Sequence, residues 1–138
     1  FPGQSSFAGR ILHSHAYKDP TPFANAHVAV VGIGNSGLDV SVEVSRVAAQ
    51  TYLSTRSGAY IFNRLTPRGA APMDYSTITR FNTGIVPSFL TNAVMENVIA
   101  DKEGMDRFGI RPKHRALGAH PSINGEFFGR AACGVRER

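Results

Sequence analysis

The sequence of 138 residues predicts an α/β fold, a partial Rossmann-type dinucleotide-binding domain with parallel strands and a crossover helix. Three observations predict it: a β-branched run at residues 27–31, a glycine-rich turn directly after it, and a helical pattern that leads to a second strand. A helical and irregular insertion accounts for the remainder. The chain offers fewer parallel strands than a doubly wound sheet needs by itself, so we expect the domain to be incomplete.

The elements follow in order along the first half of the chain. Residues 1–26 are rich in Pro, Gly, Ser and Asn and predict an irregular linker, with 10–13 as a candidate short strand. The run at 27–31 is typical of a buried parallel strand. Apolar residues at helical spacing predict a helix over 38–50, and 51–55 predicts the second strand. We expect the crossover between the two strands to be right-handed.

Beyond this unit the pattern is weaker. Repeated Gly and Pro between 57 and 86 predict loops with short helical turns. Pro87 suits the first turn of a helix, which we expect to end at Gly104. The tail from 105 to 138 is expected to be mostly irregular, with a candidate strand over 130–135.

Composition narrows the classes of function. The net charge is +5, and twelve of the fifteen basic residues are Arg, spread along the chain without a dense basic run. This distribution favours a phosphate-bearing small ligand or an acidic neighbouring domain over a DNA duplex, with an ordinary basic surface as the open alternative. RNA binding is the weakest alternative. The single cysteine, Cys133, excludes an internal disulfide framework and a Cys-rich zinc site. No apolar stretch reaches the length of a membrane span, and the five histidines have no metal-ligand spacing.

The strongest motif is GIGNSG at residues 32–37, because it lies between a predicted strand and a predicted helix. Gly32 permits a tight turn, Gly34 lets a pyrophosphate approach the backbone, and Gly37 lets the helix lie close to the sheet. The helix N-terminus then faces the phosphates, where Asn35 and Ser36 can cap the helix or donate hydrogen bonds to the ligand. The alternative is a plain glycine-rich turn.

The end of the second strand bears on the choice of cofactor. NAD-binding units usually carry an acidic residue about 20 residues after the first glycine. Here the chain has Ser54, Thr55, Arg56 and Ser57 instead. Hydroxyls and a guanidinium suit the 2′-phosphate of NADP, so we predict NADP rather than NAD. The alternative is that Arg56 is an ordinary surface residue at a strand end.

Residues 7–17 fit the pattern F-x-G-x-x-x-H-x-x-x-[YF], a signature of flavin-containing monooxygenases, and precede the glycine motif by the appropriate distance. Further stretches also resemble this family, in particular its animal dimethylaniline monooxygenase-like branch: HSHAYKDP, GIGNSGLDVSVEVS, LSTRSGAYIFNR and RFGIRPKHRALGAHPSIN. The chain differs at Ser57, where many relatives have a second Arg, and at His15 and Ala16, where many have Arg-Asp.

The resemblance implies a domain organisation and a cofactor site. In the family an NADPH domain is inserted within an FAD domain, so residues 1–26 would be a linker from the missing FAD domain and 27–138 an incomplete NADPH-binding domain. No catalytic acid, base, nucleophile or metal ligand is expected in this chain. The resemblance assigns the following residues to NADPH: Gly32, Gly34, Asn35, Ser36, Gly37, Leu38, Asp39, Ser54, Thr55 and Arg56.

The resemblance also implies the activity of the whole enzyme. Family members use NADPH, FAD and O₂ to oxygenate soft nucleophiles such as amines and sulfides. We expect the present chain to be part of such an oxidoreductase, to lie against the FAD domain, and to be inactive alone. The family further implies a location at the endoplasmic reticulum membrane. The alternative from a different class is a standalone NADP(H)-binding module without turnover.

Overall fold

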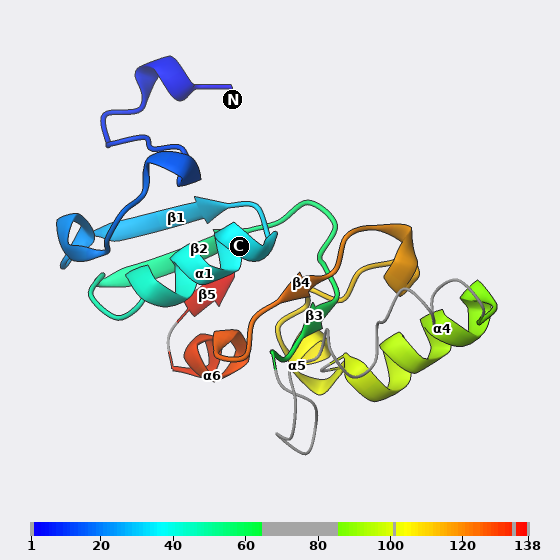
Figure 1. Cartoon of the computed structure of the whole chain (residues 1–138). Coiled ribbons are helices and arrows are strands. Elements are labelled where there is room, and N and C mark those ends of the chain that lie inside the picture. Colours follow the sequence, from blue (N-terminus) through cyan, green and yellow to red (C-terminus); the bar gives the residue numbers. More distant parts are fainter. Residues whose placement is uncertain (1, 65–85, 101, 134, 138) are drawn as a thin grey trace.

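The computed structural model describes residues 2–64, 86–100, 102–133 and 135–137. Its main sheet has three parallel strands in the order β1-β2-β5, which are His27–Val31, Gln50–Ser54 and Val135–Glu137 (Figure 1). Strands β1 and β2 pair along their whole length, with Val31 opposite Ser54. The carboxyl ends of β1 and β2 therefore lie at one edge of the sheet.

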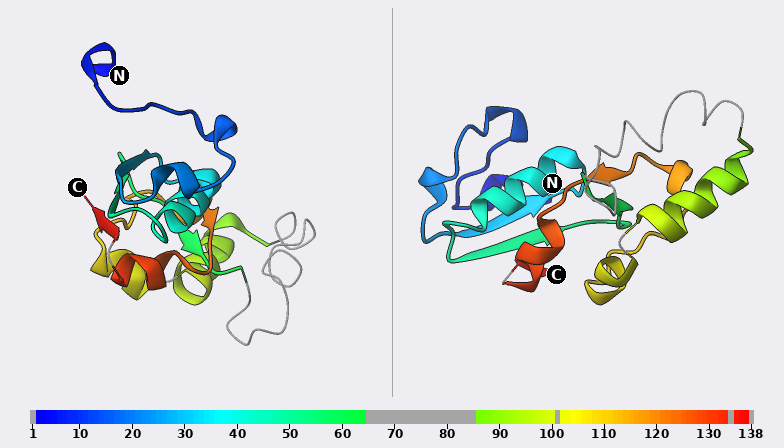
Figure 2. Two further views of the ribbon diagram at one scale, coloured as in Figure 1. Left: turned by 90° about the vertical axis from the view of Figure 1, so that its left-hand side faces the viewer. Right: turned by 60° about the horizontal axis from the view of Figure 1, so that its bottom comes forward.

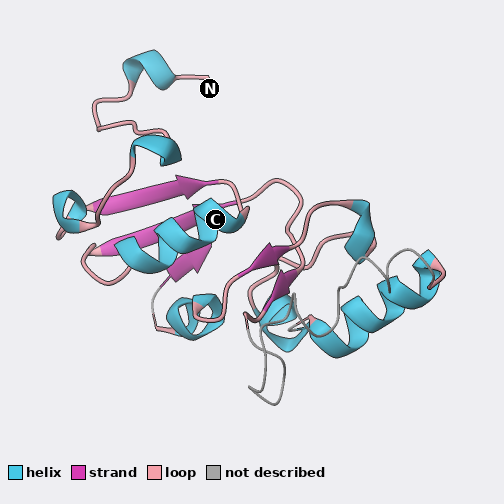
Figure 3. Ribbon diagram, viewed as in Figure 1, coloured by secondary structure: helices cyan, strands magenta, loops and turns pink. Residues whose placement is uncertain are grey.

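Helix α1, Asn35–Val44, connects β1 to β2 and lies against the sheet, as the coloured elements of Figure 3 show. Helix α6, Phe127–Ala132, lies beside α1 and precedes β5. The predicted strand-helix-strand unit and the α/β class are confirmed. The hydrophobic core contains side chains from the sheet, both helices and the second half of the chain: Leu38, Val42, Leu53, Phe62, Met105, Ile110 and Phe127.

A second, two-stranded parallel sheet lies next to the carboxyl edge of the first. It pairs β3, Ile61–Phe62, with β4, Ser122–Ile123. The chain between them contains α4, Ser88–Val94, a π-helical turn η4, Met95–Ile99, then α5, Lys102–Arg107, and a 3₁₀ turn η5, Ala116–Gly118. Figure 2 shows that α4 lies on the far side of this small sheet from β1 and β2.

The described part of the N-terminal linker has no strand, so the expectation of a short strand over 10–13 is wrong. The linker contains three short 3₁₀ turns, η1 Gln4–Ser6, η2 Ser14–Ala16 and η3 Thr21–Phe23, and most of it is exposed (Figure 2). No strand of the described chain lies beside 10–13, so its backbone has nothing to pair with. The linker is tied to α1 by the Tyr17 hydroxyl, which donates to Glu43 Oε2 at 3.0 Å.

The predicted helix over 38–50 starts too late and ends too late. It begins at Asn35 because the glycine turn itself enters the helix, with Gly34 as the N-cap. It ends at Val44 because the following residues turn back toward the sheet. In that turn Asn25 N–H donates to the Val47 carbonyl at 2.9 Å, and Ala49 N–H donates to the Ala26 carbonyl at 3.0 Å.

Two expectations for the second half also need correction. Pro87 precedes a helix as predicted, but Gly104 lies inside α5 rather than at a helix end. The helix breaks earlier, at Ala100, which forms a β-bridge with Phe62. Helix α6 occupies the first half of the candidate strand over 130–135, and β5 begins only at Val135.

The predicted loops over 57–86 are interrupted by β3. The rest of that prediction, over 65–85, falls outside the described residues.

Candidate functional site

The glycine turn lies at the carboxyl edge of the main sheet, between β1 and α1. Gly32 has a φ of 111°, a left-handed conformation that side-chain-bearing residues rarely adopt. Its N–H donates to the Ser54 carbonyl at 2.9 Å, so the start of the turn is joined to the end of β2. The two segments that the sequence assigned to one cofactor therefore lie side by side.

The other two glycines of the motif have different surroundings. A Cβ on Gly37 would lie 2.1 Å from the Gly32 carbonyl oxygen, so only glycine lets α1 approach the turn this closely. A Cβ on Gly34 would meet no atom within 4 Å, and this residue is exposed. The backbone at Gly34 thus borders open space in which a ligand could lie against it.

The N-terminus of α1 opens onto the same space. The first N–H groups of a helix have no carbonyl partner within the helix, and no side chain caps α1 at Gly34. These N–H groups and the positive end of the helix dipole suit an anion, in particular a phosphate. The turn therefore fits the pyrophosphate of a dinucleotide.

Arg56 follows β2 at the same edge. Its side chain is exposed, and within the described parts of the chain it has no hydrogen bond or ion pair. By contrast, four other arginines are paired with carboxylates: Arg46 with Glu126, Arg64 with Asp39, Arg111 with Asp106, and Arg115 with Glu96. A guanidinium without a carboxylate partner beside exposed Ser54 suits a second phosphate.

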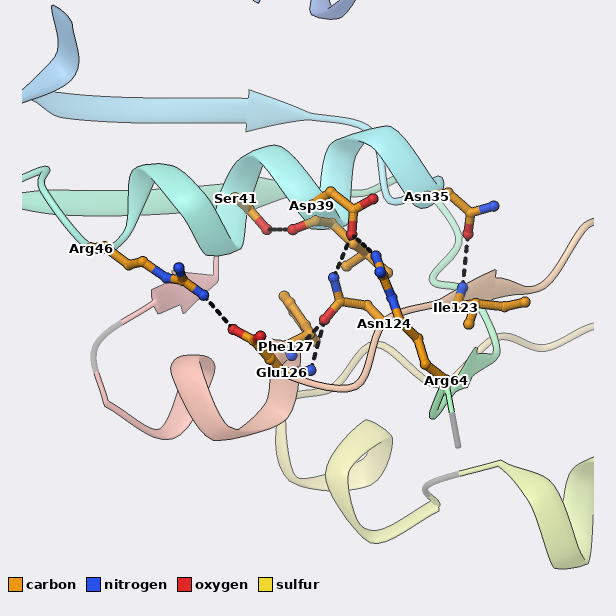
Figure 4. A network of polar contacts seen from close by, with 10 residues as sticks. Asn35, Asp39, Ser41, Arg46, Arg64, Ile123, Asn124, Glu126 and Phe127 are labelled. Atoms are coloured by element: carbon orange, nitrogen blue, oxygen red, sulfur yellow. Dashed lines mark hydrogen bonds and ion pairs between the residues drawn. The ribbon is translucent and has the colours of Figure 1, made fainter. Parts of the chain in front are cut away.

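Strand β4 lies beneath the glycine turn, and Figure 4 shows its contact with Asn35 at the start of α1. The Ser122 hydroxyl donates to the Ile33 carbonyl at 2.7 Å, and Ile123 N–H donates to Asn35 Oδ1 at 2.8 Å. The Asn124 side-chain amide then donates to Asp39 Oδ1 at 2.8 Å.

Asp39 has a second partner. Arg64, shortly after β3, donates to the same Oδ1 of Asp39 at 2.9 Å (Figure 4). The carboxylate on α1 is therefore compensated by a cation and an amide, and both of its partners come from the second sheet and the residues that follow its strands.

The structure separates the ten predicted cofactor residues into groups. Ser36 and Arg56 have exposed side chains, whereas Leu38 lies in the core and faces the turn only with its backbone. Asn35 does not cap the helix, because its side chain is turned toward β4. Thr55 Oγ1 accepts the N–H of Gly58 at 3.1 Å, which shapes the turn after β2. That these ten residues hold NADPH stays a prediction.

Sequence reasoning missed Arg64, Ser122 and Asn124. Ser122 and Asn124 occur in the stretch HPSIN, which resembles the family, but no local pattern places them beside residues more than eighty positions earlier. Only the pairing of β3 with β4 brings them there.

Two tyrosines have perturbed acidity. Burial, followed by the hydrogen bond to Glu43, raises the pKa of Tyr17 above its ordinary range. Burial also raises the pKa of Tyr60, helped by the nearby Glu96 carboxylate. Neither tyrosine belongs to the glycine turn.

The described residues contain no group of three or more His, Cys, Asp and Glu side chains placed to hold a metal ion. In the same part of the chain, no helix is long and apolar enough to cross a membrane.

The parallel strands, the crossover helix and the glycine turn define a Rossmann-type unit, the class of fold that binds dinucleotides. A sequence model of the family described as flavin-binding monooxygenase-like matches residues 1–137, so the chain belongs to that family. The family resemblance inferred from the motifs is thereby confirmed.

The chain is similar to several curated relatives of this family. It is 44% identical over 138 residues to flavin-containing monooxygenase 5 of Rattus norvegicus, covering 98% of this chain and 26% of the relative. The identity is 41% over 137 residues to flavin-containing monooxygenase 5 of Homo sapiens, with the same coverage of 98% and 26%. It is 33% over 138 residues to human flavin-containing monooxygenase 3, again covering 98% and 26%. The chain thus spans about a quarter of the length of these relatives.

A solved structure shares the fold. Cyclohexanone monooxygenase from Rhodococcus sp. Phi1, determined with bound NADP⁺, matches with a TM-score of 0.57 at 12% identity, over 99% of this chain and 36% of the other. At this identity the match supports the α/β fold alone.

Proposed function

We propose that this chain is the NADPH-binding portion of an FAD-dependent monooxygenase that oxygenates amines or sulfides. The observation that carries the proposal is the open carboxyl edge of β1 and β2. There the N-terminus of α1, without a side-chain cap, and Arg56, without a partner among the described residues, lie at the ends of neighbouring strands. These are the groups that the pyrophosphate and the 2′-phosphate of NADPH require.

Each part of the edge has a role in this proposal. The N–H groups at the start of α1 bind the pyrophosphate, and Gly34 leaves room for it. Arg56 binds the 2′-phosphate, with Ser54 and Thr55 beside it. The absence of an acidic residue at 54–57 removes the carboxylate that would repel this phosphate.

The chain's contribution to the reaction is to hold and orient the nicotinamide cofactor. When bound in the whole enzyme, NADPH supplies the hydride that reduces the flavin, and FAD supplies the oxygen-transfer chemistry. We place FAD outside this chain, on a domain of the same protein against which the sheet would lie. The amine or sulfide substrate, O₂ and a location at the endoplasmic reticulum membrane belong to the same proposal and rest on the family.

The test compares cofactors that differ only in the 2′-phosphate. Calorimetric titration of the purified chain should give tighter binding of NADPH than of NADH. Arg56→Ala should weaken NADPH binding about tenfold or more, because it removes charge-assisted hydrogen bonds, and should leave NADH binding nearly unchanged. Arg10→Ala, in the exposed linker, is the matched control. Equal affinity for the two cofactors, unaffected by Arg56→Ala, would refute the assignment of NADPH.

A further inference from the structure

Three consecutive residues of the Ser122–Asn124 segment reach the glycine turn, and we name this segment the β4 clamp. Ser122 contacts Ile33, within the turn, and Asn124 contacts Asp39, after it. Ile123 N–H holds the side chain of Asn35, at the start of α1. The contacts of the clamp thus extend from Ile33, within the turn, to Asp39, in the second turn of α1. Figure 4 shows those at Asn35 and Asp39.

The clamp is itself rigidly held. Ser122 N–H donates to the Tyr60 carbonyl at 2.8 Å, and Asn124 N–H donates to the Phe62 carbonyl at 2.9 Å, which pairs the clamp with β3. Both side chains are buried, with 2% of Ser122 and 4% of Asn124 exposed.

Asn124 also joins the clamp to α6. Its Oδ1 accepts the N–H groups of Glu126 and Phe127 at 2.9 and 2.8 Å, at the start of that helix. Its amide nitrogen is thereby directed at Asp39, because the side-chain oxygen is already occupied by the α6 backbone.

A glycine-rich turn has many accessible backbone conformations, and ordering it on binding costs free energy. We propose that Ser122 and Asn124 are positioning residues of the NADPH site, which fix residues 33–39 in the conformation that presents the α1 N–H groups to the pyrophosphate. This inference rests on the proposed function. It adds two residues that do not touch the cofactor and act through the turn.

A purely structural role would lower stability without changing affinity, so the test separates the two. Ser122→Ala is compared with Ser41→Ala. Both serines are buried, and both donate to a backbone carbonyl, Ser122 to Ile33 at 2.7 Å and Ser41 to Leu38 at 2.8 Å. Ser41 lies within α1, and its hydroxyl bonds to a carbonyl of the same helix.

The dissociation constant for NADP⁺ is measured by calorimetry well below the melting temperature of each variant. We expect Ser122→Ala to weaken NADP⁺ binding about fivefold, from the loss of one buried hydrogen bond that orders the turn, with Ser41→Ala close to wild type. Ser122→Thr, which keeps the hydroxyl, should restore the affinity.

Asn124→Asp provides a second test that is independent of Ser122. It keeps the oxygen that accepts the α6 N–H groups and places a carboxylate oxygen against Asp39. The charged groups around this pair are Arg64, which binds Asp39, and Glu126, which is paired with Arg46. The two carboxylates should repel and displace the turn near neutral pH, and a shared proton should relieve this at lower pH.

For Asn124→Asp, the ratio of the variant to the wild-type dissociation constant should therefore fall as the pH is lowered from about 8 to about 5. Wild-type affinity in both Ser122→Ala and Asn124→Asp, at reduced stability, would overturn the positioning role. If Ser122→Ala does not fold, Asn124→Asp decides alone. A wild-type chain that binds no NADP⁺ would instead refute the proposed function, and the positioning role with it.

Discussion

At the scale of single residues, Thr51 has a buried hydroxyl without a hydrogen-bond partner among the described residues. It lies on β2 and is almost completely buried, on the same face of the strand as the core residue Leu53. An unsatisfied buried polar group costs about 1–3 kcal/mol.

Thr51→Val should therefore raise the free energy of unfolding by about 1 kcal/mol, because it keeps the shape and removes the unsatisfied hydroxyl. Thermal or urea unfolding of the purified chain measures this. Thr51→Ser, which keeps the hydroxyl and loses the methyl group, should destabilise the chain. A clear loss of stability in Thr51→Val would mean that the hydroxyl has a partner.

Tyr17 makes the stability of the folded chain depend on pH in the alkaline range. Burial and the hydrogen bond to Glu43 raise its pKa in the folded state, so the folded chain retains a proton that the unfolded chain loses above about pH 10. The contribution to stability is complete below that pH and is lost as the pH rises further.

Tyr17→Phe should consequently flatten the decrease in melting temperature above about pH 10, relative to the wild type. Glu43→Gln should flatten it in part, because it removes the carboxylate but not the burial. Melting curves of the three proteins at several pH values check this. Parallel profiles for wild type and Tyr17→Phe would exclude a role of the tyrosine.

At the scale of elements, two glycines lie where the glycine turn meets α1, and they differ in the space available for a side chain. A methyl group on Gly37 would collide with the backbone at Gly32, whereas one on Gly34 would enter open space. Gly34 has φ −71° and ψ 176°, which any residue can adopt.

Gly37→Ala should therefore destabilise the fold by about 2 kcal/mol or more, since α1 must move away from the turn. Gly34→Ala should cost at most about 1 kcal/mol and should weaken NADPH binding about tenfold, since its methyl group occupies the space of the pyrophosphate. Urea unfolding and NADPH titration of both variants test the pair. Undiminished affinity in a folded Gly34→Ala variant would place the pyrophosphate elsewhere.

The elements also differ in how far the sequence could predict them. Strands β1 and β2 were predictable because their β-branched and aromatic residues flank a glycine turn. Strands β3 and β4 have two residues each and exist because Tyr60 and Phe62 carbonyls accept N–H groups from Ser122 and Asn124. Pairing between two short strands so far apart in the sequence leaves no local sequence pattern that would predict either strand.

The same division holds for the candidate site. The glycines and Arg56 could be predicted from their spacing in the sequence, because the turn and the end of the second strand belong to one continuous strand-helix-strand unit. The Asn35 side chain points toward Ile123 instead of capping the helix. This orientation depends on the distant strand β4, so it could not be predicted from the residues next to Asn35 in the sequence.

At the scale of the whole molecule, the chain leaves apolar surface uncovered on two sides. On α4, Phe89 is 64% exposed and Leu90 is 47% exposed, while Val31 on β1 is 63% exposed. Among the described strands, β1 pairs on one side only, with β2. Such surfaces suit contact with further protein, which agrees with the proposal that an FAD domain lies against this unit.

The central claim is that this unit binds NADPH, and that FAD binds elsewhere in the protein. Titration of the purified chain with NADPH, NADH and FAD, following its melting temperature, tests this most directly, because a ligand that binds only the folded state raises that temperature. The account predicts a clear increase with NADPH, a smaller one with NADH and none with FAD. An increase with FAD and none with NADPH would contradict it.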